Sequence, residues 1–111
     1  MKINVMIVKP NQLPKVTEIE NDLFTYQHIV DGYIEEIHIG KNLVALINDE
    51  GAFLGMTPNF NIGYMTIVGP AILLRTEGDT EYHSLKPAQI EECWEIVRDG
   101  RGYGGNTFVK H

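Results

Sequence analysis

Leu43-Val44-Ala45-Leu46-Ile47 is an unbroken apolar run, and the polar stretch Asn48-Asp49-Glu50-Gly51 follows it directly. The apolar run predicts a strand. Asn, Asp and Gly supply the left-handed conformations and local hydrogen bonds of turns, so a loop should follow this strand to Asn59 and run on through Phe60 and Gly63. Loops with more polar chemistry than a turn needs are common places for function on a rigid scaffold. We therefore take residues 48–59 as the first candidate binding site.

The composition limits the class of protein. The chain has 111 residues, 43% of them hydrophobic, with a net charge of −6, which predicts one globular domain with a single core. Its nine Lys and Arg residues are scattered, which argues against general nucleic-acid binding because counterion release needs clustered cations. No apolar run could span a membrane or form a signal peptide. A lone cysteine, Cys93, fits a reducing cytoplasm.

Three further elements are expected before the apolar run. Residues 2–9 (KINVMIVK) predict a largely buried strand. Apolar residues then recur at three- and four-residue spacing, which predicts a helix from about Pro14 that Asp31-Gly32 closes. Residues 33–39 predict a strand that turns through Gly40-Lys41 into the apolar run.

Two strands and a helix are expected after the polar loop. Residues 65–75 predict a strand with a break at Gly69-Pro70, because proline cannot donate to a ladder. Residues 80–85 predict a short returning strand. Pro87 should begin a second helix that ends at Asp99-Gly100. Its apolar stripe is expected to comprise Ile90, Cys93, Trp94 and Val97.

These elements predict an α+β fold, with two helices packed on a small mixed β-sheet of roughly four to six strands. No internal repeat or linker is visible, so residues 1–98 should form a single domain. Residues 99–111 form a glycine-rich C-terminal tail, in which Thr107-Phe108-Val109 could pair as an edge strand.

The polar loop has two interpretations. Its amide and carboxylate groups, Asn48, Glu50 and Asn59, could orient a small ligand beside the aromatic rings of Phe53 and Phe60. In that case the polar side chains should converge on one cavity. The alternative is an ordinary hairpin tip whose side chains diverge into solvent.

A carboxylate on the preceding strand is a further candidate. Glu35 and Glu36 are adjacent, so they point to opposite faces, and Glu35 shares its face with Ile37 and Ile39. Glu35 should therefore point inward, where a carboxylate needs a partner or a pocket. The alternative is an edge-strand charge that faces water.

The tail offers Arg101-Gly102-Tyr103-Gly104-Gly105, which suggests a phosphate cradle. Phosphate-binding glycines normally precede a helix, whereas these follow one, so the motif is weak. The alternatives are a flexible tail, or a tail that folds over a ligand or a neighbouring subunit through Arg101 and Tyr103.

Catalytic chemistry finds little support. Ser84 is the only serine and lacks the nucleophile-elbow motif, and the histidines are not paired at metal-ligand spacing. Cys93 lies on the apolar stripe, where a cysteine is usually an inert small hydrophobe. We therefore assign no catalytic residue, no metal ligand and no cofactor.

The order of several motifs resembles the domain of unknown function DUF3846 over roughly residues 1–97. The residues that carry the resemblance are Lys9-Pro10, Val30-Asp31-Gly32-Tyr33, Asn48-Asp49-Glu50-Gly51, Pro58-Asn59, Val68-Gly69-Pro70 and Ser84-Leu85. The resemblance implies a protein of bacteriophages, plasmids and their bacterial hosts, located in the host cytoplasm, without an established activity.

Three functions follow as hypotheses. The first is a non-catalytic protein that binds a small polar ligand, for example a nucleotide-derived one, alone or as a homo-oligomer. Its setting would be counter-defence. The second is an acidic module that docks on a host protein through Glu18, Glu20, Asp22, Glu91, Glu92 and Glu95. The third is an enzyme that acts through Glu35 and the loop of residues 48–59.

Overall fold

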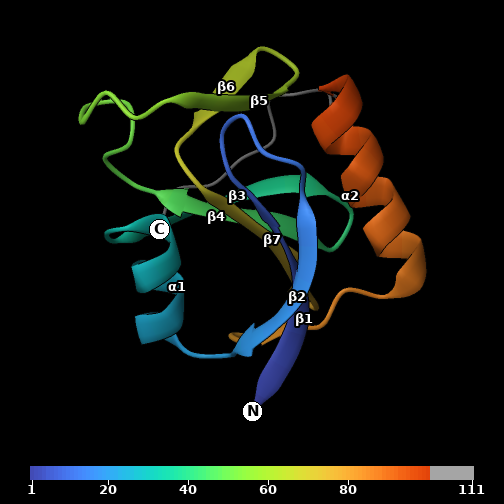
Figure 1. Cartoon of the computed structure of the whole chain (residues 1–111). Helices are drawn as coiled ribbons and strands as arrows, with labels where there is room; N and C mark the ends of the chain where they lie inside the picture. The colour runs from blue at the N-terminus through green and yellow to red at the C-terminus, as the bar shows by residue number, and fades with distance from the viewer. Residues whose placement is uncertain (101–111) are drawn as a thin grey trace.

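A computed structural model describes residues 1–100, which form two β-sheets and two helices (Figure 1). The strands of the main sheet, from one edge to the other, are β2 (Lys15–Glu20), β1 (Lys2–Val8), β7 (Ala71–Thr76), β4 (Leu43–Asn48) and β3 (Ile34–Gly40), with β8 (Tyr82–His83) paired to β7. The remaining elements are β5 (Pro58–Ile62) and β6 (Met65–Val68), which form the smaller sheet, α1 (Leu23–Val30) and α2 (Pro87–Asp99).

The α+β prediction is confirmed, but the pairings are not mixed. Every pairing between the described strands is antiparallel. A parallel pair needs a long crossover between neighbouring strands. Here the connection that contains α1 instead leads from one edge strand, β2, to the opposite edge strand, β3. The chain therefore gains a helix without creating a parallel pair.

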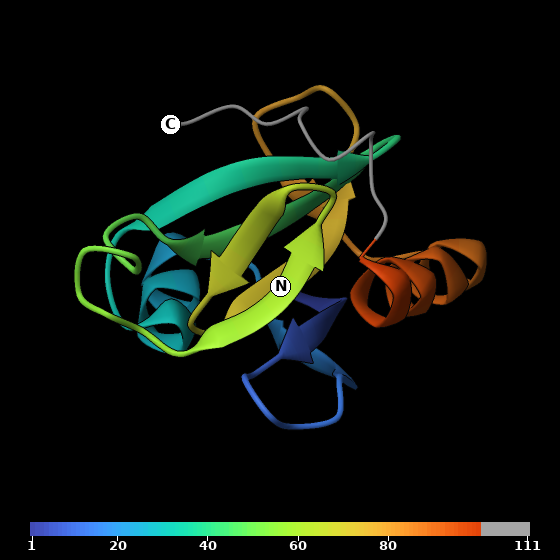
Figure 2. The ribbon, with the colours of Figure 1, turned by 90° about the horizontal axis from the view of Figure 1, so that it is seen from above.

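The core has two layers, one on each face of the main sheet. Because side chains alternate across a strand, Val5 and Ile72 face one side, whereas Met6 and Leu73 face the other. The side of Val5 is covered by α1, which packs on β3, β4 and β7. The side of Met6 is covered by α2 together with the β5–β6 hairpin, which lies over the main sheet in Figure 2. The predicted apolar run is the interior strand β4, which lies between β7 and the edge strand β3, and it is buried throughout.

The expected helix from Pro14 to Asp31 is wrong over its first half. Residues 15–20 instead form β2, which pairs with β1 along its whole length in a hairpin. The sequence Lys-Val-Thr-Glu-Ile-Glu contains three β-branched residues, which suit a strand, and the half-buried Thr17 and Ile19 alternate with exposed neighbours. The helix begins only after Asp22, whose side chain accepts a hydrogen bond from Thr25 N at 2.8 Å. Asp31, rather than Gly32, adopts the left-handed C-cap conformation.

The expected break at Gly69-Pro70 is confirmed. It separates β6, in the smaller sheet, from β7, in the middle of the main sheet. The strand β5 was missed, since residues 58–62 were expected to be loop. A proline and two asparagines disfavour a strand locally. Pairing with β6 and burial of Phe60 and Ile62 outweigh that preference.

The second helix forms as predicted, but its buried face is rotated relative to the predicted apolar stripe. Cys93 is fully buried and Ile96 is 4% exposed, whereas Trp94 is 38% exposed. The expectation that Trp94 is buried against the sheet is therefore wrong. The sheet and the β5–β6 hairpin contact the side of α2 that carries Cys93 and Ile96, which leaves Trp94 at the margin. No helix among residues 1–100 is both long and apolar enough to cross a membrane.

Candidate functional site: a lysine-lined cleft beside the first helix

The polar loop does not bring its amide groups together over one ligand. The Asn48 amide nitrogen donates to Val30 O at 3.2 Å and to Asp31 O at 3.0 Å, and its oxygen accepts from Glu50 N at 2.7 Å. The side chain is only 4% exposed. It therefore joins the C-terminal end of α1 to the start of the loop, using both of its polar atoms.

Asn59 has a similar internal role elsewhere in the fold. Its amide nitrogen donates to Val8 O and to Gly69 O, each at 2.8 Å. It thereby ties β5 to the end of β1 and to the break before β7. The predicted convergence of Asn48, Glu50 and Asn59 on one cavity is not observed, because the two amides serve separate backbone segments.

The aromatic residues of the loop also separate. Phe60 is buried in the core, whereas the Phe53 side chain is 88% exposed and Glu50 lies on the surface. Neither of the two clefts described below is lined by these residues. A ligand role for Glu50 and Phe53 stays a prediction. Arg101 and Tyr103 lie outside the described residues, so their predicted role stays a prediction as well.

Glu35 points inward, as its alternation with Ile37 and Ile39 predicted. It is 7% exposed on the β5–β6 side of the edge strand β3, and its Oε2 has no hydrogen-bond partner among the described residues. A buried carboxylate oxygen without a partner is costly. No group of residues 1–100 bonds this oxygen, and the predicted role of Glu35 in ligand binding stays a prediction.

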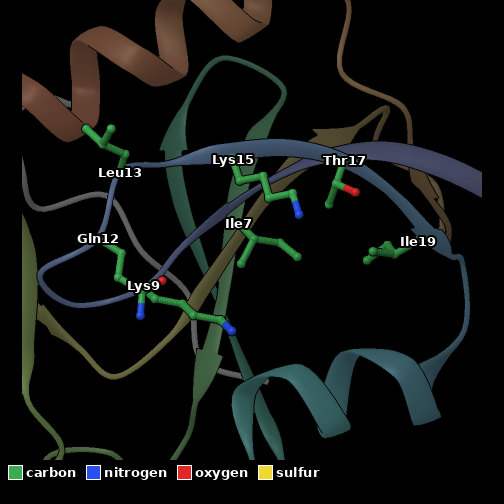
Figure 3. Close-up of a pocket in the computed structure, with 7 residues that line it drawn as sticks. All are labelled: Ile7, Lys9, Gln12, Leu13, Lys15, Thr17 and Ile19. Atoms are coloured by element: carbon green, nitrogen blue, oxygen red, sulfur yellow. The ribbon is translucent and has the colours of Figure 1, made fainter.

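A cleft opens on the α1 side of the sheet because α1 is short. The helix has eight residues and packs on β3, β4 and β7, so it leaves the β1–β2 end of this face uncovered. The uncovered end is hollowed into a cleft of about 450 Å³. Its lining, drawn in Figure 3, consists of Ile7, Lys9, Gln12, Leu13, Lys15, Thr17 and Ile19.

The β1–β2 register sets the geometry of this cleft. Ile7 lies opposite Lys15 in the antiparallel pair, and Thr17 lies one position further along the same face. Lys9 follows Ile7 by two residues beyond the end of β1. In Figure 3 the Ile7 side chain therefore lies between the two lysine side chains, which extend in the same direction. Ile19 forms the far wall toward α1.

The cleft is a local cationic site on an acidic chain. No Asp or Glu lines it, and within residues 1–100 neither the Lys9 nor the Lys15 ammonium group takes part in an ion pair. Both lysines are exposed, whereas Ile7, Thr17 and Ile19 are half-buried. Two cationic donors, a hydroxyl and an amide thus stand above an apolar floor. Such an arrangement can hold an anionic group and an apolar surface of the same ligand.

A second cleft, of about 350 Å³, lies beside the N-terminal end of α1. Its walls include Tyr26 and Tyr82, whose rings meet edge to face with centroids 5.6 Å apart. The Tyr82 hydroxyl donates to Glu36, and the other Glu36 oxygen lies 3.3 Å from His38 Nε2. The Tyr26 hydroxyl donates to Asn21.

The tyrosines of this second cleft are suited to structure more than to catalysis. Burial raises the pKa of Tyr26 to about 12, with Asp22 adding to the effect. Burial, followed by the hydrogen bond to Glu36, also raises the pKa of Tyr82. Both hydroxyls therefore stay protonated at neutral pH and serve as donors to partners within the protein. The Cys93 thiol is equally unreactive, since burial raises its pKa to about 12.

A faint signal for the first cleft is present in the amino-acid sequence. Lys9 and Lys15 flank a short turn-forming segment, residues 10–14, so a hairpin there would place them together. Because residues 14–31 were expected to be helical, Lys15 was assigned to a helix and the pair was missed. The error in secondary structure and the missed site therefore have the same cause.

The comparison with family models returned DUF3846, described as a domain of unknown function, over residues 1–98. The comparisons with curated proteins and with solved structures each gave no significant match.

Proposed function

The chain belongs to the DUF3846 family, and from this premise we propose that it is a non-catalytic binding protein whose β1–β2 cleft holds a small anionic ligand. The observation that carries the proposal is the pair Lys9 and Lys15, which line one cleft without an acidic partner there. On a chain with a net charge of −6, two lysines that line one cleft without an acidic residue there suit a negatively charged ligand.

The size and chemistry of the cleft support a small ligand. Its volume of about 450 Å³ lies within the range of roughly 300–1,000 Å³ usual for small-molecule sites. Apolar walls with a few polar groups at the rim are also typical of such sites. A nucleotide-derived ligand fits this mixture. The bacteriophage and plasmid setting that the family resemblance implies makes capture of a host signalling nucleotide, as a counter-defence, a reasonable role.

Calorimetric titration of the whole chain tests the proposal. The panel should contain mononucleotides, cyclic dinucleotides and ADP-ribose derivatives, and at least one should bind with a dissociation constant well below 1 mM. Thr17→Trp should abolish that binding by filling the cleft. Val16→Trp is the matched control, because Val16 lies on the opposite face of the same strand and is already 40% exposed. Absence of binding across the panel, or equal loss in both variants, would refute the proposal.

A second function, docking on a host protein, is favoured by the exposure of Trp94. On α2, Glu91 lies one turn before Trp94 and Arg98 lies one turn after it, on neighbouring positions of the helix surface. Exposed tryptophans are frequent hot spots of protein interfaces. A host protein with an apolar pocket and a basic rim would complement this surface. Capture of such a protein by the chain should weaken as the salt concentration rises and should be lost in Trp94→Ala. Capture that is unchanged by salt and by Trp94→Ala would exclude this surface as the docking site.

A further inference from the structure

The arrangement of charge in the β1–β2 cleft restricts the ligand further than the proposed function does. The cleft presents two ammonium groups, Lys9 and Lys15, on the same side of Ile7. Lys15 pairs directly with Ile7 across the β1–β2 hairpin, and Lys9 follows Ile7 by two residues, just beyond the end of β1. A bound anion can therefore meet both positive charges without rearrangement of the backbone.

We infer that the ligand is a dianionic phosphate compound, a terminal phosphomonoester on an apolar or planar body; this inference rests on the proposed function. Two positive charges are balanced by a phosphomonoester, which carries close to two negative charges at neutral pH, and only half balanced by a phosphodiester. Lysine binds phosphate well as a compact point charge. The Thr17 hydroxyl and the Gln12 amide, in the same lining, add neutral donors for phosphate oxygens.

The rest of the ligand should be held by apolar contact. Ile7 and Ile19 are half-buried and pack against the core layer beneath α1, so they form a fixed apolar surface next to the cations. A nucleoside or a similar ring system can lie on this surface while its phosphate meets the lysines. A free inorganic phosphate would use only half of the site and should bind more weakly.

Titration of the whole chain with three matched probes, adenosine 5′-monophosphate, adenosine 3′,5′-cyclic monophosphate and adenosine, tests the inference at pH 8 and low salt. The monophosphate should bind at least about fivefold more tightly than the cyclic diester, because each additional charge pair in water contributes roughly that factor. Lys9→Met and Lys15→Met should each weaken the monophosphate by at least about fivefold while leaving adenosine unchanged. The preference should disappear near pH 5, where the monoester has lost one charge, its second pKa being about 6.

Lys41→Met is the matched control, because it removes the same charge from the exposed β3–β4 turn outside the cleft. An equal effect in Lys41→Met and Lys15→Met would show general charge attraction and overturn the inference. If the monoester and the diester bind with equal affinity, the ligand need not be a dianion, and the inference is overturned. If Thr17→Trp also abolishes that binding, the proposed function still stands. No binding of any probe or of the wider panel would overturn both.

Discussion

Replacement of Asn48 by alanine should destabilise the fold strongly, because this side chain joins α1 to the loop after β4. It is 4% exposed and makes hydrogen bonds to Val30 O, Asp31 O and Glu50 N at 3.2, 3.0 and 2.7 Å. A net hydrogen bond contributes about 1 kcal/mol, and a buried group left without its partner costs about 1–3 kcal/mol. The free energy of unfolding should therefore fall by about 2–4 kcal/mol.

Urea denaturation followed by circular dichroism measures this loss as a shift of the midpoint at constant m-value. Asn61→Ala is the control, since its side chain is exposed and accepts only the bond from Thr66 Oγ1 at 2.9 Å among those described. The control should change stability by about 0.5 kcal/mol or less. A loss below about 1 kcal/mol in Asn48→Ala would refute the structural role and return Asn48 to the predicted role in ligand binding.

Three further predictions concern single positions in or beside the core. Gly32→Ala should lower the free energy of unfolding, because the new Cβ would lie 2.5 Å from the Asn48 amide nitrogen. In a double-mutant cycle this loss should be smaller in the Asn48→Ala background. Losses that simply add would contradict the contact between the two positions. Glu35→Leu should keep or raise the free energy of unfolding in urea, by up to about 3 kcal/mol, because it removes a buried oxygen without a partner; a clear loss would mean that the carboxylate is paired. Cys93 should react with a thiol reagent only after unfolding, and labelling of the native protein would disprove its burial. Burial raises the pKa of the folded thiol from 9.0 to about 12. Its contribution to the free energy of unfolding should therefore be complete below about pH 9 and decline as the pH rises toward 12.

Most of the fold could be predicted where the local pattern and the tertiary environment agree. The run Leu43–Ile47 is apolar at every position, and it lies inside the main sheet between β7 and β3, where both faces are covered. Gly69-Pro70 cannot continue a ladder, and the chain leaves one sheet for the other at that point. Glu35 points inward because alternation with Ile37 and Ile39 leaves it no other face.

The sequence-based predictions are wrong where a segment distant in sequence determines which of two locally compatible structures forms. Val16 and Ile19 satisfy a helical spacing, but Thr17 and Ile19 also have the two-residue spacing of one strand face, and all three residues are β-branched. Pairing with β1 favours the strand over the helix, and no feature within residues 15–20 indicates that this pairing will occur. The prediction that Trp94 is buried is wrong for a similar reason. Helical spacing places it near Cys93, but the position of the sheet determines how far the buried face extends.

The candidate site follows from the same choice between helix and strand. Had residues 14–31 formed one helix, it would have covered the α1 side of the sheet more fully, and Lys15 would have been far from Lys9. Because Asp22 caps the helix late, α1 keeps only eight residues and the β1–β2 end of the sheet stays open. The same hairpin that shortens α1 places Lys15 opposite Ile7, beside Lys9. One departure from the local helical pattern thus creates both the cleft and the pair of charges that line it.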